Sequence, residues 1–103
     1  MLKVISLMKR KEGMSLEAFR KWALEEHPPL GKQLPGIRHY RMSVVLTDDP
    51  NLPCDAVSEF WFDSNEARQA AFATPQGRAA AEDATNHCSS RVHLLTEEKV
   101  ILE

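Results

Sequence analysis

One histidine stands out because it is expected at the end of a helix. His27 follows an apolar helical stripe that includes Trp22 and is followed by Pro28 and Pro29. Proline disfavours a helical backbone at the residue before it, so we expect the helix to end at His27 or one residue earlier. A histidine side chain titrates near pH 6.5 and can therefore exchange a proton near neutral pH. His27 is the leading candidate for proton transfer; alternatively, its ring binds the last free carbonyls of the helix.

The other candidate site residues lie in two segments whose alternating pattern of side chains is typical of β-strands. Tyr40 and Met42 share one face of a strand expected over residues 37–46, and the Tyr40 phenol can donate a hydrogen bond to a carbonyl, lactone or phenolate. Glu59 shares a face with Trp61, and a carboxylate that faces an apolar interior is costly unless it is paired or protonated. We therefore predict that His27 and Tyr40 are catalytic and that Met42, Glu59 and Trp61 bind the substrate.

Each of these candidates also has a purely structural explanation. Tyr40 can be an interface aromatic residue whose hydroxyl meets water or backbone. Glu59 can pair with Arg41 or Arg38 across the sheet, or face solvent at a strand edge. Trp61 can belong to the core. The residues alone leave these alternatives open.

The sequence contains no pattern typical of a metal or cofactor site. The four histidines are not spaced at i, i+4, and Cys54 and Cys88 do not form a Cys-x-x-Cys pair. The four glycines are scattered and form no phosphate-binding loop. We therefore expect neither a metal nor a cofactor, and two reduced thiols rather than a disulfide.

The elements that position these residues follow from hydrophobic periodicity and capping residues. Strands are expected over residues 2–8, 37–46, 56–62 and 91–102. Ser15 is the expected N-cap of the first helix, and Pro29 is expected to open a second, short one. Asp63 with Glu66 resembles a capping box, and Thr74 is expected to cap an alanine-rich helix over residues 76–86.

This order of elements predicts a ferredoxin-like α+β fold in a single domain over residues 1–103. A four-stranded antiparallel sheet would carry its helices on one face. A sheet face exposed to water should alternate apolar and polar residues, yet the first three strands are apolar on both faces. A second copy of the chain is the direct way to cover the open face, which predicts a homodimer with a barrel-like interior. Met42 and Val44 are expected on that dimer face.

Composition excludes several kinds of partner. The formal net charge is −2 and the pI is about 6.1, whereas a nucleic-acid or anionic-membrane surface needs an excess of basic residues. No stretch approaches the roughly 20 apolar residues of a membrane span. Residues 1–8 are too short for the apolar region of a signal peptide. We expect a cytoplasmic protein that binds neither nucleic acid nor membrane.

The order of motifs resembles the EthD family of small bacterial proteins. The resemblance is carried by residues 9–15, 26–30, 34–36 and 55–62, together with Phe19, Trp22 and Tyr40. It implies a dimeric α+β barrel, a superfamily that includes muconolactone isomerases, cofactor-free monooxygenases, polyketide cyclases and heme-handling proteins. His27 matches the histidine implicated in isomerase-like relatives. No residue matches a defined axial heme ligand, so heme binding is not carried over.

Together these observations predict a homodimer that holds a small, largely apolar molecule with a few oxygens. As an enzyme it would be a cofactor-independent isomerase, cyclase or monooxygenase, in which His27 moves a proton and Tyr40 polarises a carbonyl. One alternative is a non-catalytic ligand-binding or accessory protein of a degradation pathway. Another is a structural dimer module with a filled interior.

Overall fold

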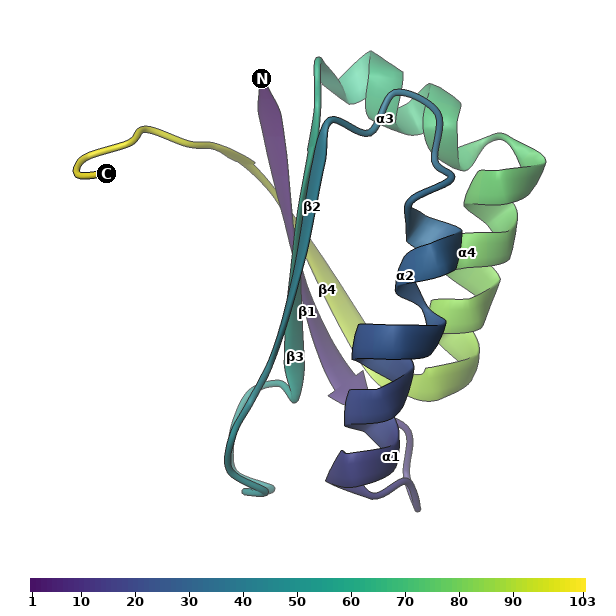
Figure 1. The fold of residues 1–103 in the computed structure, drawn as a ribbon, viewed down its shortest axis with the longest axis vertical. Coiled ribbons are helices and arrows are strands. Elements are labelled where there is room, and N and C mark those ends of the chain that lie inside the picture. Colours follow the sequence, from purple (N-terminus) through teal and green to yellow (C-terminus); the bar gives the residue numbers. More distant parts are fainter.

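The computed structural model describes residues 1–103 as one sheet with helices on one of its faces (Figure 1). The strands are β1 (Leu2–Arg10), β2 (His39–Val44), β3 (Ala56–Phe62) and β4 (Cys88–Glu97). The helical segments are α1 (Leu16–Lys21), the π-helical η1 (Trp22–Glu26), α2 (Pro28–Gly31), α3 (Asn65–Phe72) and α4 (Pro75–His87). The strand order is β2-β3-β1-β4 and every neighbouring pair is antiparallel. The predicted ferredoxin-like α+β fold is confirmed. None of the helices has the length and apolar character needed to cross a membrane.

Side-chain caps fix where the helices begin. Ser15 and Thr74 accept hydrogen bonds from backbone N–H groups of the first turns of α1 and α4, as predicted. The cap of α3 differs, because Ser64 rather than Asp63 accepts the backbone hydrogen bond. Asp63 instead forms an ion pair with Arg38 at 2.8 Å. Both residues are of types that cap helices, and the sequence alone does not show which of the two is used.

The last strand starts and ends earlier than its sequence pattern predicts. β4 pairs with β1 along its length, and the final pair joins Glu97 to Leu2 at the start of β1. Beyond that pair no strand is left to accept its backbone hydrogen bonds, so the chain leaves the sheet. Residues 98–103 run away from the body of the molecule on the side opposite the helices (Figure 1).

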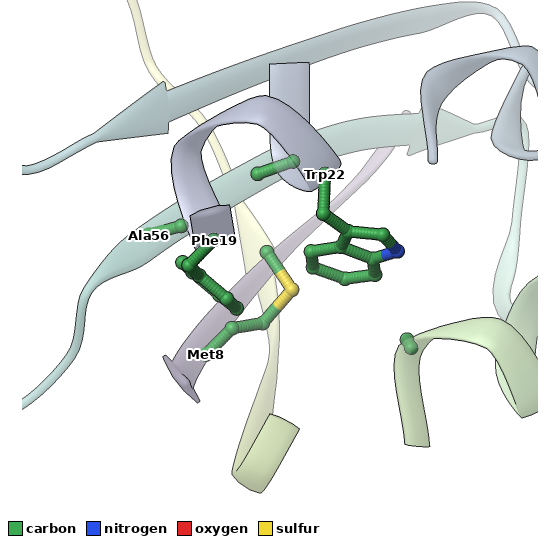
Figure 2. Packing of buried hydrophobic residues seen from close by; sticks show 6 residues of the cluster. Met8, Phe19, Trp22 and Ala56 are labelled. Atoms are coloured by element: carbon green, nitrogen blue, oxygen red, sulfur yellow. The ribbon is translucent and has the colours of Figure 1, made fainter. Parts of the chain in front are cut away.

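Strand register decides which side chains face the helices. Met42 and Val44 pack against a buried cluster beneath η1 and α4, so they face the helices and not the predicted dimer interface. The cluster consists of Met8, Phe19, Trp22, Ala23, Ala56 and Ala84 (Figure 2). The predicted orientation of Met42 and Val44 was wrong because both faces of these strands are apolar. In such strands, alternation separates the two faces without showing which one the helices cover.

A π-helical turn connects α1 to α2. The backbone N–H of His27 donates to the carbonyl of Trp22, five residues earlier, at 2.8 Å. This wider turn keeps the two side chains on the same buried side, with ring centroids 4.8 Å apart. The helical segment ends at Glu26, within the predicted range, but the sequence did not indicate its π-helical form.

Helices α3 and α4 approach each other closely at Gly77, which gives a test of the packing. A Cβ at this position would lie 2.3 Å from the Ala71 carbonyl oxygen and 2.5 Å from the Phe72 Cα. Alanine favours a helix by roughly 1 kcal/mol over glycine. Because backbone atoms would have to move, we expect an overpacking cost of about 1–3 kcal/mol. Gly77→Ala should therefore lower the free energy of unfolding in urea.

The control for this test is Gln76→Ala at the exposed neighbouring position. It should leave the urea midpoint almost unchanged, since no backbone has to move. A Gly77→Ala protein that is more stable than the wild type would contradict the close approach of the two helices.

Candidate functional site

A cavity lies between the helices and the helix-facing side of the sheet. Its polar lining residues are Ser6, His27, Tyr40, Ser58, Arg91 and His93, and apolar side chains make up most of the remainder. The volume within which the centre of a water molecule can move is about 50 Å³. A single water needs roughly 10–15 Å³ on this measure, so the cavity holds more than one. The surrounding empty volume is about 450 Å³, including space open to solvent at the mouth.

His27 lies on the cavity wall and is only 8% exposed. Its Nδ1 lies 2.8 Å from Oδ2 of Asp83 in α4. An ionised carboxylate can only accept hydrogen bonds, so Nδ1 carries the proton and donates it. This leaves Nε2 as the ring nitrogen available to a ligand. The alternative in which the His27 ring caps its own helix is not what the structure shows, because the ring binds a side chain of another helix.

Asp83 is itself held by several groups. Its Oδ2 also accepts a hydrogen bond of 3.0 Å from the Trp22 indole N–H. His87 Nδ1 donates to the Asp83 backbone carbonyl at 2.7 Å, and the His87 ring stacks on Trp22 with centroids 4.8 Å apart. In Figure 2 the indole nitrogen of Trp22 points away from the Met8 side chain. The carboxylate is therefore fixed in position before any ligand arrives.

Asp83 was not among the residues predicted from the sequence, although the sequence carries a signal for it. Ala80 lies three residues before it and His87 four residues after it, so these three residues share one helix face. A single carboxylate on a face of small residues indicates a partner on the element that packs there.

Tyr40 reaches the same cavity from β2 and lies against α2. A Cβ at Gly31 would come within 2.8 Å of Cε2 and 3.1 Å of the hydroxyl of Tyr40, so the ring can occupy this position only beside a glycine. Burial, with a smaller contribution from the charge of Asp83, raises the pKa of Tyr40 to about 12. At neutral pH Tyr40 is therefore an uncharged phenol that can donate a hydrogen bond.

A row of polar side chains crosses the floor of the cavity. Ser6 on β1 is the register partner of both Ser58 on β3 and His93 on β4. The two serines are buried, and Arg91 lines the cavity two residues before His93. This row was not predicted from the sequence. The sequence did carry a signal for it. In each of two strands, a serine takes an inward position between inward residues that are apolar.

The structure does not bring Glu59 and Trp61 to this cavity. Successive side chains of a strand point to opposite faces, and Phe60 between them lines the cavity. Glu59 forms an ion pair of 2.7 Å with Lys3 rather than with either predicted arginine. The Lys3 ammonium and the Arg41 guanidinium lie 4.9 and 5.0 Å from the Trp61 ring centroid on the open face.

Met42 shares the helix-facing side with Tyr40 but packs into the core cluster. It is not among the residues that line the cavity. Of the five predicted site residues, the structure thus brings together His27 and Tyr40.

Titration of Tyr40 provides a direct test of its burial, because it is the only tyrosine in the chain. We expect phenolate absorbance to appear with a midpoint near pH 12 in the folded protein. The unfolded chain should titrate near pH 10. Because the folded state holds this proton more tightly, stability is fully present below about pH 10 and is lost as the pH rises through the folded pKa.

The matched variant for this titration is Gly31→Ala. The added methyl group must displace the Tyr40 ring toward solvent, so the midpoint should fall toward the unfolded value. Circular dichroism at each pH would confirm that the chain is still folded. A wild-type midpoint near pH 10 in the folded state would contradict the buried position of the phenol.

Comparisons with known proteins agree with this architecture. The EthD domain model matches residues 11–89, a range that contains His27, Tyr40 and Asp83. An uncharacterised 11.0 kDa protein encoded between thcB and thcC in Rhodococcus erythropolis is 32% identical over 87 residues. The match covers 82% of this chain and 84% of that protein.

Solved structures show the same fold. An ethyl tert-butyl ether D (EthD) family protein from Bacillus halodurans superposes with a TM-score of 0.80 at 25% identity, covering 96% of this chain and 99% of that one. A dimeric ferredoxin-like protein of unknown function from Thermobifida fusca superposes with a TM-score of 0.74 at 16% identity, covering 92% and 88%. From the domain match and the Rhodococcus relative it follows that this chain belongs to the EthD family.

Proposed function

We propose that this protein is a cofactor-independent acid–base catalyst that acts on a small, largely apolar molecule carrying a few oxygens. The observation that carries the proposal is the 2.8 Å hydrogen bond between His27 and Asp83 at the wall of the cavity. It fixes the tautomer of the imidazole, and the second nitrogen, which has no hydrogen-bond partner within the chain, is the proposed base. A positioned base of this kind contributes typically 10²–10⁴-fold to a rate.

The proposed reaction begins with proton removal by Nε2 of His27. The proton comes from a carbon beside a carbonyl, or from a phenol, and the imidazole becomes an imidazolium. Asp83 stabilises this cation, because its carboxylate already accepts the Nδ1 proton. Tyr40 donates a hydrogen bond to the oxygen on which negative charge develops. Return of the proton to another atom completes an isomerisation.

The same carbanion supports the other reactions that fit this site. Attack on a second carbonyl of the same molecule would give a cyclisation. Reaction of the carbanion with dioxygen as a co-substrate would give a hydroperoxide, and loss of water from it would leave a new carbonyl, so that one oxygen atom enters the product and the other leaves as water. Apolar walls around the anion exclude water, which strengthens the hydrogen bonds of Tyr40 and His27 with the ligand. Cys54 and Cys88 are unpaired, which fits action in a reducing compartment such as the cytoplasm.

Proton transfer can be tested by exchange of deuterium from solvent into carbon-bound positions of candidate lactones, phenols and anthrones. We expect His27→Gln to slow the exchange by about 10²-fold or more, because glutamine keeps a donor but cannot act as a base at neutral pH. Asp83→Asn should also slow it, since an amide cannot stabilise the imidazolium equally. NMR of the ligand measures the rate.

The control is His39→Gln, which removes a histidine on the open face of the sheet, and its exchange rate should equal that of the wild type. Full activity of His27→Gln on a substrate of the wild-type protein would remove His27 from the mechanism. A ligand that binds the wild type without any exchange would favour the non-catalytic alternative, an accessory protein of a degradation pathway.

We also propose that two copies pack through the open faces of their sheets. Ile5, Leu7, Val57, Val92 and Leu94 are register neighbours on this face. Val92 is 50% exposed and Leu94 44% exposed in the single chain. The T. fusca protein of the same fold is described as dimeric. Exposed apolar residues at positions 100–102, beyond β4, add to the surface that a second copy would cover.

Sedimentation should give twice the 11.7 kDa chain mass. We expect Leu94→Asp to shift the protein to monomer or aggregate, because the interface would bury an unpaired charge. Leu24→Asp is the matched control, since Leu24 has a similar exposure of 39% but lies on the helical side. A wild-type monomer at micromolar concentration would contradict the proposal.

A further inference from the structure

We propose that the natural ligand of the cavity carries a carboxylate on an apolar body, and that Arg91 binds this carboxylate. The inference rests on the cavity described under the proposed function and names the class of molecule that the cavity takes. It does not depend on whether His27 transfers a proton.

The charge of the cavity wall favours an anion. Its fifteen lining residues include no aspartate or glutamate, and Arg91 is the only one with a permanent charge. An apolar cavity with one cation and no anion attracts an anionic group, because the opposite charge offsets the cost of desolvation. Asp83 lies behind His27 and already accepts two hydrogen bonds, so its charge is partly satisfied.

Arg91 is available for this role because no carboxylate of the chain neutralises it. Arg10 pairs with Asp48, and Arg38 pairs with Asp63, whereas Arg91 forms no ion pair. Its guanidinium makes one hydrogen bond within the chain, from Nη2 to a threonine hydroxyl in α4 at 2.8 Å. A guanidinium has five N–H donors, so most of the donors of Arg91 remain free to bind a planar carboxylate.

The polar row on the sheet extends the site from Arg91 toward His27. Arg91 and His93 are inward-facing residues of β4, and Ser6 and Ser58 continue the row across β1 and β3. Serine side chains are small and can turn their hydroxyls to donate to an oxygen anion. A carboxylate held at Arg91 would leave the apolar body of the ligand between the sheet and the alanines of α4, near His27.

A matched pair of small probes tests this assignment. Isobutyrate and isobutyramide have nearly the same shape, but only the first carries a charge. We expect isobutyrate to bind at least about tenfold more tightly, measured by NMR titration of the cavity side chains, because its hydrogen bonds to Arg91 are charge-assisted. Arg91→Met removes the charge while keeping an apolar stem, and the preference for isobutyrate should disappear.

Two further variants serve as controls. Arg20→Met removes an exposed arginine of α1 outside the cavity and should leave the preference unchanged. Arg91→Lys keeps the charge and should retain part of the preference. Equal affinity of the wild type for both probes, or an unchanged preference in Arg91→Met, would overturn the proposal.

The His27→Gln protein separates this inference from the proposed function. If it still prefers isobutyrate but shows no loss of deuterium exchange, the anion site stands and the proton-transfer role of His27 falls. If neither probe shifts any cavity resonance in the wild type, the cavity does not bind carboxylates and the anion assignment fails. Loss of exchange in His27→Gln would then still support the catalytic proposal.

Discussion

The carboxylate of Asp83 joins the core of this protein to its cavity. One oxygen accepts hydrogen bonds from the indole of Trp22, a residue of the buried cluster, and from the imidazole of His27 on the cavity wall. A carboxylate that is only partly exposed needs such partners, because desolvation of an unpaired charge is costly. The two donors come from η1 and its end, and the acceptor comes from α4. The same interaction therefore holds the two helical segments together and orients the candidate base.

The π-helical turn makes this arrangement possible. In a regular α-helix, residues five positions apart point in clearly different directions. Here the backbone hydrogen bond from His27 to Trp22 widens the turn, and the two rings lie 4.8 Å apart on the same side. Both N–H groups can then reach one oxygen of Asp83. Insertions of this kind occur often at functional sites, which agrees with the position of His27 at the cavity.

The fold could be predicted from the sequence, whereas the site could be predicted only in part. Periodicity and capping residues are local signals, and they gave the order of elements and the caps of α1 and α4. The partner of His27 lies 56 positions away in the chain, so no local pattern identifies it. Glu59 and Trp61 were assigned to the cavity because both faces of β3 are apolar, and the register with β1 shows that they belong to the other face.

The central strand β1 shows how one sheet can serve two proposed functions. Its inward residue Ser6 lies on the cavity floor, while its outward neighbours Ile5 and Leu7 form the middle of the apolar open face. Because successive side chains alternate, a change on one face leaves the chemistry of the other intact, but a shift of register by one residue would exchange them. The pairing of β1 with both β3 and β4 prevents such a shift. A second copy packed on the open face would strengthen that pairing, so dimer formation would stabilise the cavity floor without supplying a residue to it.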